Sequence, residues 1–346
     1  FNFMITIKDI AREAGVSYGT VSCVLNGKAK KVRISDKTIQ KVLATAQKMG
    51  YQRNDLARSV VTGKSRVIGF LSTETTSEHC GRILSGVMNS AAKHDNFIKV
   101  IQITENSSPE EIAGICQRQR FDGIVCYQLI MAGFIEKLHE LLTGIKIPMA
   151  VVGGSYRKIK GIHVAANNEM GGRLVFEHLY SLGHRDFFVP FEYSENNWAI
   201  DRCNGFLNGA KAAGISIPEK WRPELQGCFQ NSSQYLRTVF SDKKHPTAIF
   251  CLSDYTALFI LTELYKRSFK VPEDISLVGY GNFTFASNCS PGITSIEERL
   301  IELGERCVEI LLEDISRPVC KCFTEDIFEL SKVELSIKQS TGLKSK

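Results

Sequence analysis

From residue 66 onward, short apolar segments alternate with longer amphipathic ones, and this alternation limits what most of the 346-residue chain can fold into. The apolar segments have the length of buried strands, and the amphipathic ones repeat apolar residues at helical spacing. Strands that are separated by helices form parallel sheets through right-handed crossovers, so the pattern predicts an α/β fold. The expected strands cover residues 67–72, 98–103, 123–127, 149–153, 187–190, 248–252 and 276–280, and the expected helices cover about 80–95, 109–120, 133–143, 168–182, 198–213, 232–241, 255–268 and 299–315.

So many strand and helix units exceed what one compact sheet holds, since large chains divide into several hydrophobic cores. We therefore expect two lobes, with the chain crossing between them near residues 155–165 and again near 282–296. In open α/β sheets, a small ligand binds beyond the carboxyl ends of the strands. A cleft between the two lobes is the predicted ligand site.

Residues 7–26, IKDIAREAGVSYGTVSCVLN, predict a different domain at the N-terminus. Gly15 ends a first short helix, because glycine adopts a left-handed turn without steric cost. Ser17 then offers an N-cap oxygen to a second helix over residues 18–25. Two such helices form a helix-turn-helix that can enter a DNA major groove, although an ordinary helical hairpin would share this pattern. The side chains left outside on the second helix are Tyr18, Gly19, Thr20, Ser22 and Cys23.

Positive charge is concentrated in the same region. Residues 1–65 hold 12 Lys and Arg against 4 Asp and Glu, a net charge of +8, which leaves −2 for the remainder of a chain whose total is +6. A compact basic head suits phosphate contacts, while the alternative is a solvated basic surface. A third helix is expected at about 36–49, with four apolar residues facing inward: Ile39, Val42, Leu43 and Ala46.

Residues 51–64, YQRNDLARSVVTGK, differ from both of their neighbours. They contain a helix-capable piece of about eight residues, which is too short to be stable alone. A plain linker would carry more Gly, Ser or Pro. We therefore divide the chain into a helix-turn-helix domain over 1–52, a hinge over 53–65, and a two-lobed body over 66–346.

The composition and the motifs of the sequence indicate the cellular compartment of the protein and argue against an enzyme. No apolar run approaches the roughly 20 residues of a membrane helix, and the N-terminus lacks a signal-peptide pattern. The 11 cysteines are dispersed without metal-type spacing, as small core residues of a reducing cytoplasm would be. We find no nucleophile elbow and no dinucleotide-binding frame. The chain is therefore expected to be a cytoplasmic protein that is not an enzyme and needs neither metal nor cofactor.

Several motifs in order along the chain resemble lactose-repressor/galactose-repressor family regulators. In the head these are TIKDIAREAGVS from Thr6, TVSCVLNG from Thr20, Gly50-Tyr51, and NDLARS from Asn54. In the body they include FDGI at 121–124, LGHR at 182–185, PTAIF at 246–250, Ser253-Asp254 and VPEDISLVG at 271–279. The resemblance extends over nearly the whole chain with compatible spacing.

This resemblance implies a homodimeric transcription regulator, expected to be a repressor, that binds double-stranded, pseudo-palindromic operator DNA. Its body would look like a periplasmic sugar-binding protein, and a sugar or sugar derivative in the cleft would change operator affinity by reciprocal coupling. The hinge would fold into a helix on DNA and open the minor groove. The alternative is a stand-alone cytosolic small-ligand sensor, against which the basic head argues.

The resemblance also assigns the DNA-contacting positions. Cys23 stands where many family members have an arginine that clamps a guanine, a bidentate contact that cysteine cannot make. Val60 stands where the family commonly places a leucine wedge. We therefore expect it to insert less deeply into the minor groove, or simply to pack against the second subunit of a dimer. Base reading is therefore expected to draw on other side chains and on the hinge. The full predicted DNA-binding set is Tyr18, Gly19, Thr20, Ser22, Cys23, Asn26, Arg33, Arg58 and Val60.

In the cleft, Arg202 and Asp254 match positions that hydrogen-bond effectors in relatives. An arginine and a carboxylate facing a polar ligand would suit sugar hydroxyls or an acidic group, although the two could instead form an inter-lobe salt bridge. Trp198 could stack on a sugar face or pack the lobe surface. The predicted effector-binding set is Ser72, Thr73, Trp198, Arg202, Asp254 and Asn282.

Overall fold

The computed structural model describes residues 5–52, 63–127, 133–154, 159–192, 198–225, 236–237, 239–240, 245–317 and 326–345. The chain divides into two compact units, Phe1–Ser65 and Arg66–Lys346. The helix expected at 232–241 and the hinge expected at 53–65 lie largely outside the described residues. No helix in the described ranges is long and apolar enough to cross a membrane.

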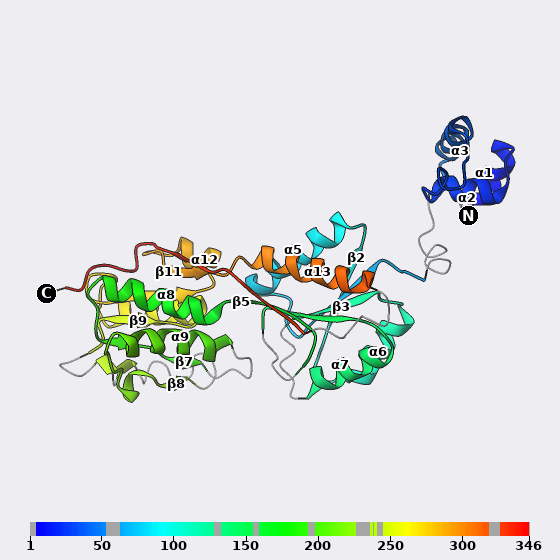
Figure 1. Cartoon of the computed structure of the whole chain (residues 1–346). Helices are drawn as coiled ribbons and strands as arrows, with labels where there is room; N and C mark the ends of the chain where they lie inside the picture. Colours follow the sequence, from blue (N-terminus) through cyan, green and yellow to red (C-terminus); the bar gives the residue numbers. More distant parts are fainter. Residues whose placement is uncertain are drawn as a thin grey trace. The chain divides into compact units, whose positions relative to one another are not determined.

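The first unit is a three-helix head, drawn in blue in Figure 1. Thr6 and Asp9 form a capping box at the start of the first helix, and Gly15 ends it with φ of 62°. Ser17 Oγ accepts the Thr20 amide proton at the start of the second helix. The predicted helix-turn-helix is present, with α1 at Ile7–Ala14, α2 at Tyr18–Leu25 and α3 at Asp36–Lys48.

One inward-facing residue of the third helix was predicted wrongly. Val42 and Ala46 are buried and Ile39 packs against their cluster, but Leu43 is 48% exposed. Successive helical residues turn by about 100°, so a core stripe through Val42 and Ala46 leaves Leu43 at its margin.

The body contains a six-stranded parallel sheet in the order β12-β5-β4-β3-β1-β2. Helices α5 and α13 pack on one face through one hydrophobic cluster, and α6 and α7 cover the other face through a second (Figure 1). The strands are β1 at Val67–Ser72, β2 at Phe97–Gln102, β3 at Gly123–Tyr127, β4 at Met149–Val152, β5 at Ile162–Ala166 and β12 at Ile327–Ser331. The helices are α5 at Glu78–Lys93, α6 at Pro109–Arg118, α7 at Phe134–Gly144 and α13 at Leu300–Ser316.

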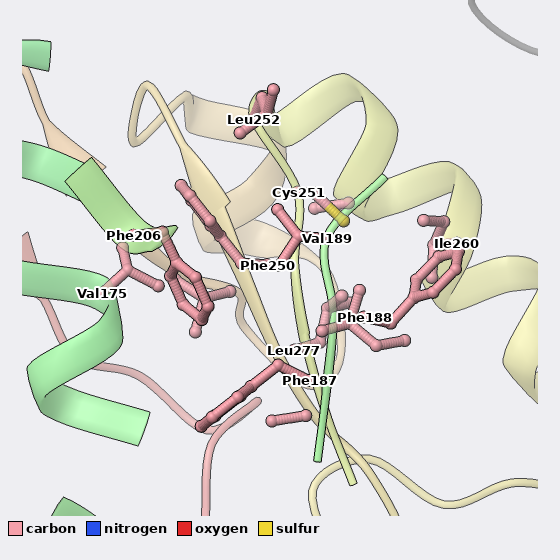
Figure 2. Packing of buried hydrophobic residues seen from close by; sticks show 14 of the residues in the cluster. Val175, Phe187, Phe188, Val189, Phe206, Phe250, Cys251, Leu252, Ile260 and Leu277 are labelled. Carbon is pink, nitrogen blue, oxygen red and sulfur yellow. The ribbon is translucent and has the colours of Figure 1, made fainter. Parts of the chain in front are cut away.

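A second sheet has the order β13-β11-β10-β9-β6, in which β13 is antiparallel to β11 and the other pairs are parallel. Figure 2 shows its core, where Val175 and Phe206 approach the strands from one side and Ile260 from the other. The strands are β6 at Phe187–Phe188, β9 at Ala248–Phe250, β10 at Ser276–Tyr280, β11 at Thr294–Glu297 and β13 at Glu334–Ser336. The helices are α8 at Asn168–Ser181, α9 at Trp198–Ala212, α11 at Asp254–Lys266 and α12 at Thr284–Asn288. Strands β7 at Phe191–Glu192 and β8 at Glu224–Leu225 form a small separate sheet, and a 3₁₀ turn covers Glu219–Trp221.

The chain passes between the two sheets later than predicted and once more than predicted. Strand β5 still belongs to the first sheet, so the first crossing lies at residue 167 instead of 155–165. Strand β11 still belongs to the second sheet, which places the next crossing at 298–299 instead of 282–296. A third crossing at 332–333 joins β12 to β13, and the sequence pattern did not reveal it because both strands are short and half exposed.

Candidate functional site

The N-terminal end of α2 presents the side chains predicted to read DNA. Tyr18 is 55% exposed and Gly19 is also exposed, whereas Thr20 is half-buried and its hydroxyl lies 2.9 Å from Ser17 Oγ. The predicted base contact of Thr20 would therefore require its hydroxyl to exchange or share this contact. Tyr18 is therefore a large aromatic side chain exposed at this end of the helix.

The remaining predicted DNA contacts differ in how far they project. Ser22 and Cys23 are half-buried, so Cys23 is set back from the surface as well as lacking an arginine's reach. Asn26 is exposed, and its amide donates to the Ser22 carbonyl oxygen at 2.8 Å. Arg33 is exposed at the end of the basic loop with φ of 55°. The predicted contacts Arg58 and Val60 lie outside the described residues.

The body contains a cavity of about 220 Å³ at the carboxyl ends of strands from both sheets. Tyr127 ends β3 of the first sheet and Tyr280 ends β10 of the second, and both line it. The cavity lies where the sequence predicted a cleft. Its lining is Glu74, Ser77, His79, Tyr127, Gly153, Trp198, Arg202, Ser253, Tyr255, Tyr280, Phe283 and Glu298.

Arg202, on α9, is held at the back of this cavity and is 6% exposed. Its guanidinium donates to Asn168 Oδ1 at 2.8 Å, to the Leu252 carbonyl oxygen at 2.8 Å and to Glu298 Oε1 at 2.7 Å. The same group lies 3.6 Å from the centroid of the Tyr280 ring. Arg202 is thus fixed in one position before any ligand binds.

Glu298 is the carboxylate partner of Arg202 and is 3% exposed. It lies at the crossing from β11 to α13, so it joins the second sheet to a helix of the first. Burial alone would raise the pKa of Glu298, but Arg202 and His79 together lower it below its ordinary value. Its second oxygen, Oε2, has no hydrogen-bond partner among the described residues.

His79, near the start of α5, brings the first lobe to this pair. Its Nε2 lies 3.8 Å from Glu298 Oε2, which is beyond hydrogen-bond distance. Its Nδ1 and the Tyr127 hydroxyl are hydrogen-bonded at 2.8 Å, and the two rings are stacked. Contacts from both lobes therefore converge on Glu298.

Asp254 does not line the cavity, so the structure does not support the expected direct contact with an effector. It is completely buried at the start of α11, where it accepts hydrogen bonds from Ser295 Oγ at 2.6 Å and the Phe283 amide at 2.8 Å. Burial raises the pKa of Asp254 to about 6. Nor is it the partner of Arg202, whose carboxylate partner is Glu298. Asp254 instead fastens the loop after β10 to α11.

Three further predicted effector residues also lie outside the cavity lining, while Trp198 is part of it. Ser72 is fully buried, and its hydroxyl caps the turn at Glu74. Thr73 is half-buried beside it. Asn282 donates to Glu297 Oε2 at 2.8 Å and its carbonyl oxygen accepts from Arg82 of α5, so it belongs to an inter-lobe contact.

Sequence reasoning missed several lining residues, although a signal for some was present. Tyr127 and Tyr280 are the last residues of predicted strands, which is where the carboxyl-end rule places ligand contacts. No local pattern marked His79, Tyr255, Phe283 or Glu298. In the described ranges, no group of three or more His, Cys, Asp or Glu side chains is arranged to hold a metal.

A helix-turn-helix head in one chain with a two-lobed, cleft-bearing body is the architecture of a regulator that can couple DNA binding to ligand binding. The family model for bacterial regulatory proteins of the lacI family matches residues 6–54, and the model for a periplasmic binding protein-like domain matches residues 176–340. The HTH-type transcriptional repressor PurR of Vibrio campbellii is 30% identical over 317 residues, covering 90% of this chain and 92% of that protein. The chain therefore belongs to the lacI family and is a DNA-binding transcriptional regulator.

Other similar proteins agree with this assignment. The ribose operon repressor of Haemophilus influenzae is 27% identical over 318 residues, covering 91% of this chain and 93% of that protein. The crystal structure of the lac repressor dimer bound to operator and the anti-inducer ONPF matches with a TM-score of 0.81 and 24% identity, covering 98% of this chain and 99% of that one. The predicted α/β fold, with its helix-turn-helix head and two-lobed body, is confirmed.

Proposed function

We propose that this regulator is a cytoplasmic homodimeric repressor that binds a pseudo-palindromic operator and changes its operator affinity when a small polar ligand enters the cleft. The observation that carries the proposal is the buried Arg202–Glu298 pair at the back of a cavity lined from both lobes. A ligand there contacts both lobes at once, so its binding energy can select one arrangement of the lobes over another.

The exposed end of α2 supports the DNA-binding part of this proposal. Tyr18 projects from it, and the exposed basic residues Lys28, Lys30, Lys31 and Arg33 follow it. In this arrangement Tyr18, Gly19, Thr20 and Cys23 face bases, and Ser22 and Asn26 face phosphates. Arg58 and Val60 of the hinge complete the proposed DNA-binding set.

The ligand class is proposed from the lining and from the relatives. Aromatic rings beside a buried ion pair suit a compact polar ligand that has apolar faces, as a sugar or sugar derivative has. A lacI family regulator from Enterococcus faecium was crystallised with bound ribose, and it matches this chain with a TM-score of 0.67 at 22% identity. Trp198 and Arg202 are the proposed ligand contacts retained from the sequence.

The proposed repressor can be tested by selecting bound duplexes from a random DNA pool with the full-length protein. We expect the selected DNA to contain two inverted half-sites. In sedimentation, the protein should have twice the chain mass of 38.6 kDa, as a dimer does. The selected duplex is then titrated with the protein in the presence of sugars and sugar derivatives. No enrichment over the random pool, or enrichment of one unrepeated half-site by a monomer, would contradict the proposal.

A further inference from the structure

Two residues that line the cavity each carry a buried side-chain oxygen without a hydrogen-bond partner among the described residues: Glu298 Oε2 and the Tyr280 hydroxyl. Both residues are at least nine-tenths buried. Buried polar groups in folded proteins are nearly always hydrogen-bonded. Two such oxygens without a partner, on residues that line one cavity, therefore indicate where the polar groups of a ligand bind. The Glu298 oxygen can only accept, and the ligand must therefore bring a donor to it.

The charges around the cavity restrict the ligand further. The described lining holds two carboxylates, Glu74 and Glu298, and one guanidinium, Arg202, which together carry a net charge of −1. Burial alone would raise the pKa of Glu74, but hydrogen bonds from Ser77 and Thr76 lower it, so this carboxylate is ionised near neutral pH.

The one guanidinium in the described lining is already committed. Arg202 donates to Glu298, Asn168 and Leu252, and its face lies against the Tyr280 ring. An anionic ligand such as a sugar phosphate would have to compete with Glu298 for this guanidinium and would lie beside two carboxylates. The electrostatics of the lining therefore disfavour anions.

Two aromatic rings in the lining favour a cation. Tyr255 and Phe283 form a tilted pair with ring centroids 5.4 Å apart, and both line the cavity. A ring face attracts an ammonium group, most strongly where water is excluded. In the described lining, the Glu298 oxygen that lacks a hydrogen-bond partner can accept an N–H group, and the two rings can stabilise a positive charge.

We infer that the effector of this regulator carries a protonated amine, as an amino sugar does, and that Glu298 Oε2 is the acceptor of its N–H group. The inference rests on the proposed ligand-binding role of the cleft. Glu298 is then the residue that distinguishes amine-bearing ligands from their hydroxyl analogues, while Arg202 holds Glu298 in place.

The test measures affinities of the full-length protein for matched pairs of probes by titration calorimetry at neutral pH. The pairs are glucosamine with glucose, benzylamine with benzyl alcohol, and cyclohexylamine with cyclohexanol, and glucose 6-phosphate is the anionic comparison. We expect the amine of at least one pair to bind about tenfold or more tightly than its hydroxyl partner, since a bond to a charged group adds this much. Glucose 6-phosphate should bind more weakly than glucose or not at all.

Two variants assign the preference to one residue. Glu298→Gln keeps the side chain's size and removes its charge, so the amine-to-hydroxyl ratio should fall to about one. Glu302→Gln, an exposed carboxylate on α13 with a side chain 62% exposed, is the matched control and should keep the wild-type ratio. Because the ratio is measured in the wild-type protein as well, a poorly folded Glu298→Gln variant does not remove the test.

Several results would overturn the inference. They are equal binding within every pair, tighter binding of a hydroxyl analogue or of the phosphate, no binding of any amine at millimolar concentration, and an unchanged ratio in Glu298→Gln. These failures differ from failure of the proposed function. A neutral ligand that binds the cleft and shifts the affinity for the selected duplex leaves the regulator proposal standing while excluding the amine.

Discussion

Arg202 Nη2 donates to Glu298 Oε1 at 2.7 Å, with both side chains almost entirely buried, and this pair links α9 of one lobe to the crossing that leads into α13 of the other. Burying either charged side chain without the other would cost free energy. A buried carboxylate without its guanidinium either remains charged in a poor solvent or takes up a proton. The pair is therefore both the back wall of the cavity and a fixed point between the lobes.

Replacing Arg202 with methionine should lower the free energy of unfolding by about 3–5 kcal/mol, because it leaves Glu298 buried and unpaired. The ligand response of DNA binding should be lost, while DNA affinity without ligand should be retained. The measurements are urea unfolding and titration of the selected duplex.

The double variant Arg202→Met with Glu298→Gln is the control for this prediction. It removes the unpaired charge and should recover a large part of the lost stability without restoring the ligand response. If the single variant lost DNA binding and ligand response equally, Arg202 would have a general structural role and no specific one in ligand sensing.

Lowering the pH should strengthen the fold through Asp254. Burial raises the pKa of this carboxyl to about 6 in the folded protein, above its ordinary unfolded value of about 3.9. The folded state therefore binds the proton more tightly, and the stability contributed by the protonated group is lost as the pH rises through 6. Between pH 7 and pH 5 the contribution should increase by about 1 kcal/mol.

Urea unfolding at the two pH values measures this effect as a difference between proteins. The Asp254→Asn variant cannot titrate at this position, so the wild type should gain stability relative to it on acidification. The Asp36→Asn variant, exposed at the start of α3, is the matched control and should follow the wild type. A wild type that loses stability relative to Asp254→Asn as the pH falls would show that the pKa of Asp254 is lowered and not raised.

The elements of this fold could be predicted because they depend on local periodicity. The expected strand over 123–127 and helices starting at 109 and 168 match the structure in position, since their apolar residues repeat within one segment. The short strand β5 was missed because small residues and a histidine break its apolar run. Edge strands such as β12 alternate weakly and carry a faint signal.

The candidate site could be predicted less fully, because its pairings join residues that are distant in sequence. Nothing near Arg202 indicates whether its carboxylate partner is Asp254 or Glu298, and only the packed structure distinguishes the two. Asp254 accepts hydrogen bonds from Ser295 and the Phe283 amide, and the guanidinium of Arg202 donates to Glu298. The direction of the strands, by contrast, would have placed Tyr127 and Tyr280 at the cleft.

A Gly172→Ala substitution should disturb the packing of α8 against α9 and displace Arg202. A Cβ atom at Gly172 would lie 1.9 Å from the Arg202 carbonyl oxygen, a backbone atom that can yield only if one helix moves. We expect a loss of about 1–3 kcal/mol or more in the free energy of unfolding and a weakened ligand response.

Gly81→Ala in α5 is the matched control, since a Cβ atom there meets nothing within 4 Å. It should raise stability by about 0.5–1 kcal/mol, because alanine is favoured over glycine inside a helix. Unfolding curves of the two variants measure the contrast. Equal effects of the two substitutions would mean that the close contact between α8 and α9 does not limit the position of Arg202.

Substitutions in the head should distinguish residues that read the base sequence from residues that contact only phosphates. Tyr18→Ala removes a large exposed side chain at the start of α2 and should weaken binding to the selected duplex far more than binding to random DNA. Lys31→Gln removes an exposed charge and should weaken both alike, lowering the slope of log affinity against log salt by about 1. Lys211→Gln removes an exposed lysine of α9 in the body and should change neither. Salt-dependent fluorescence anisotropy on both duplexes measures all three, and a Tyr18→Ala effect that is equal on selected and random DNA would exclude Tyr18 as a base-reading residue.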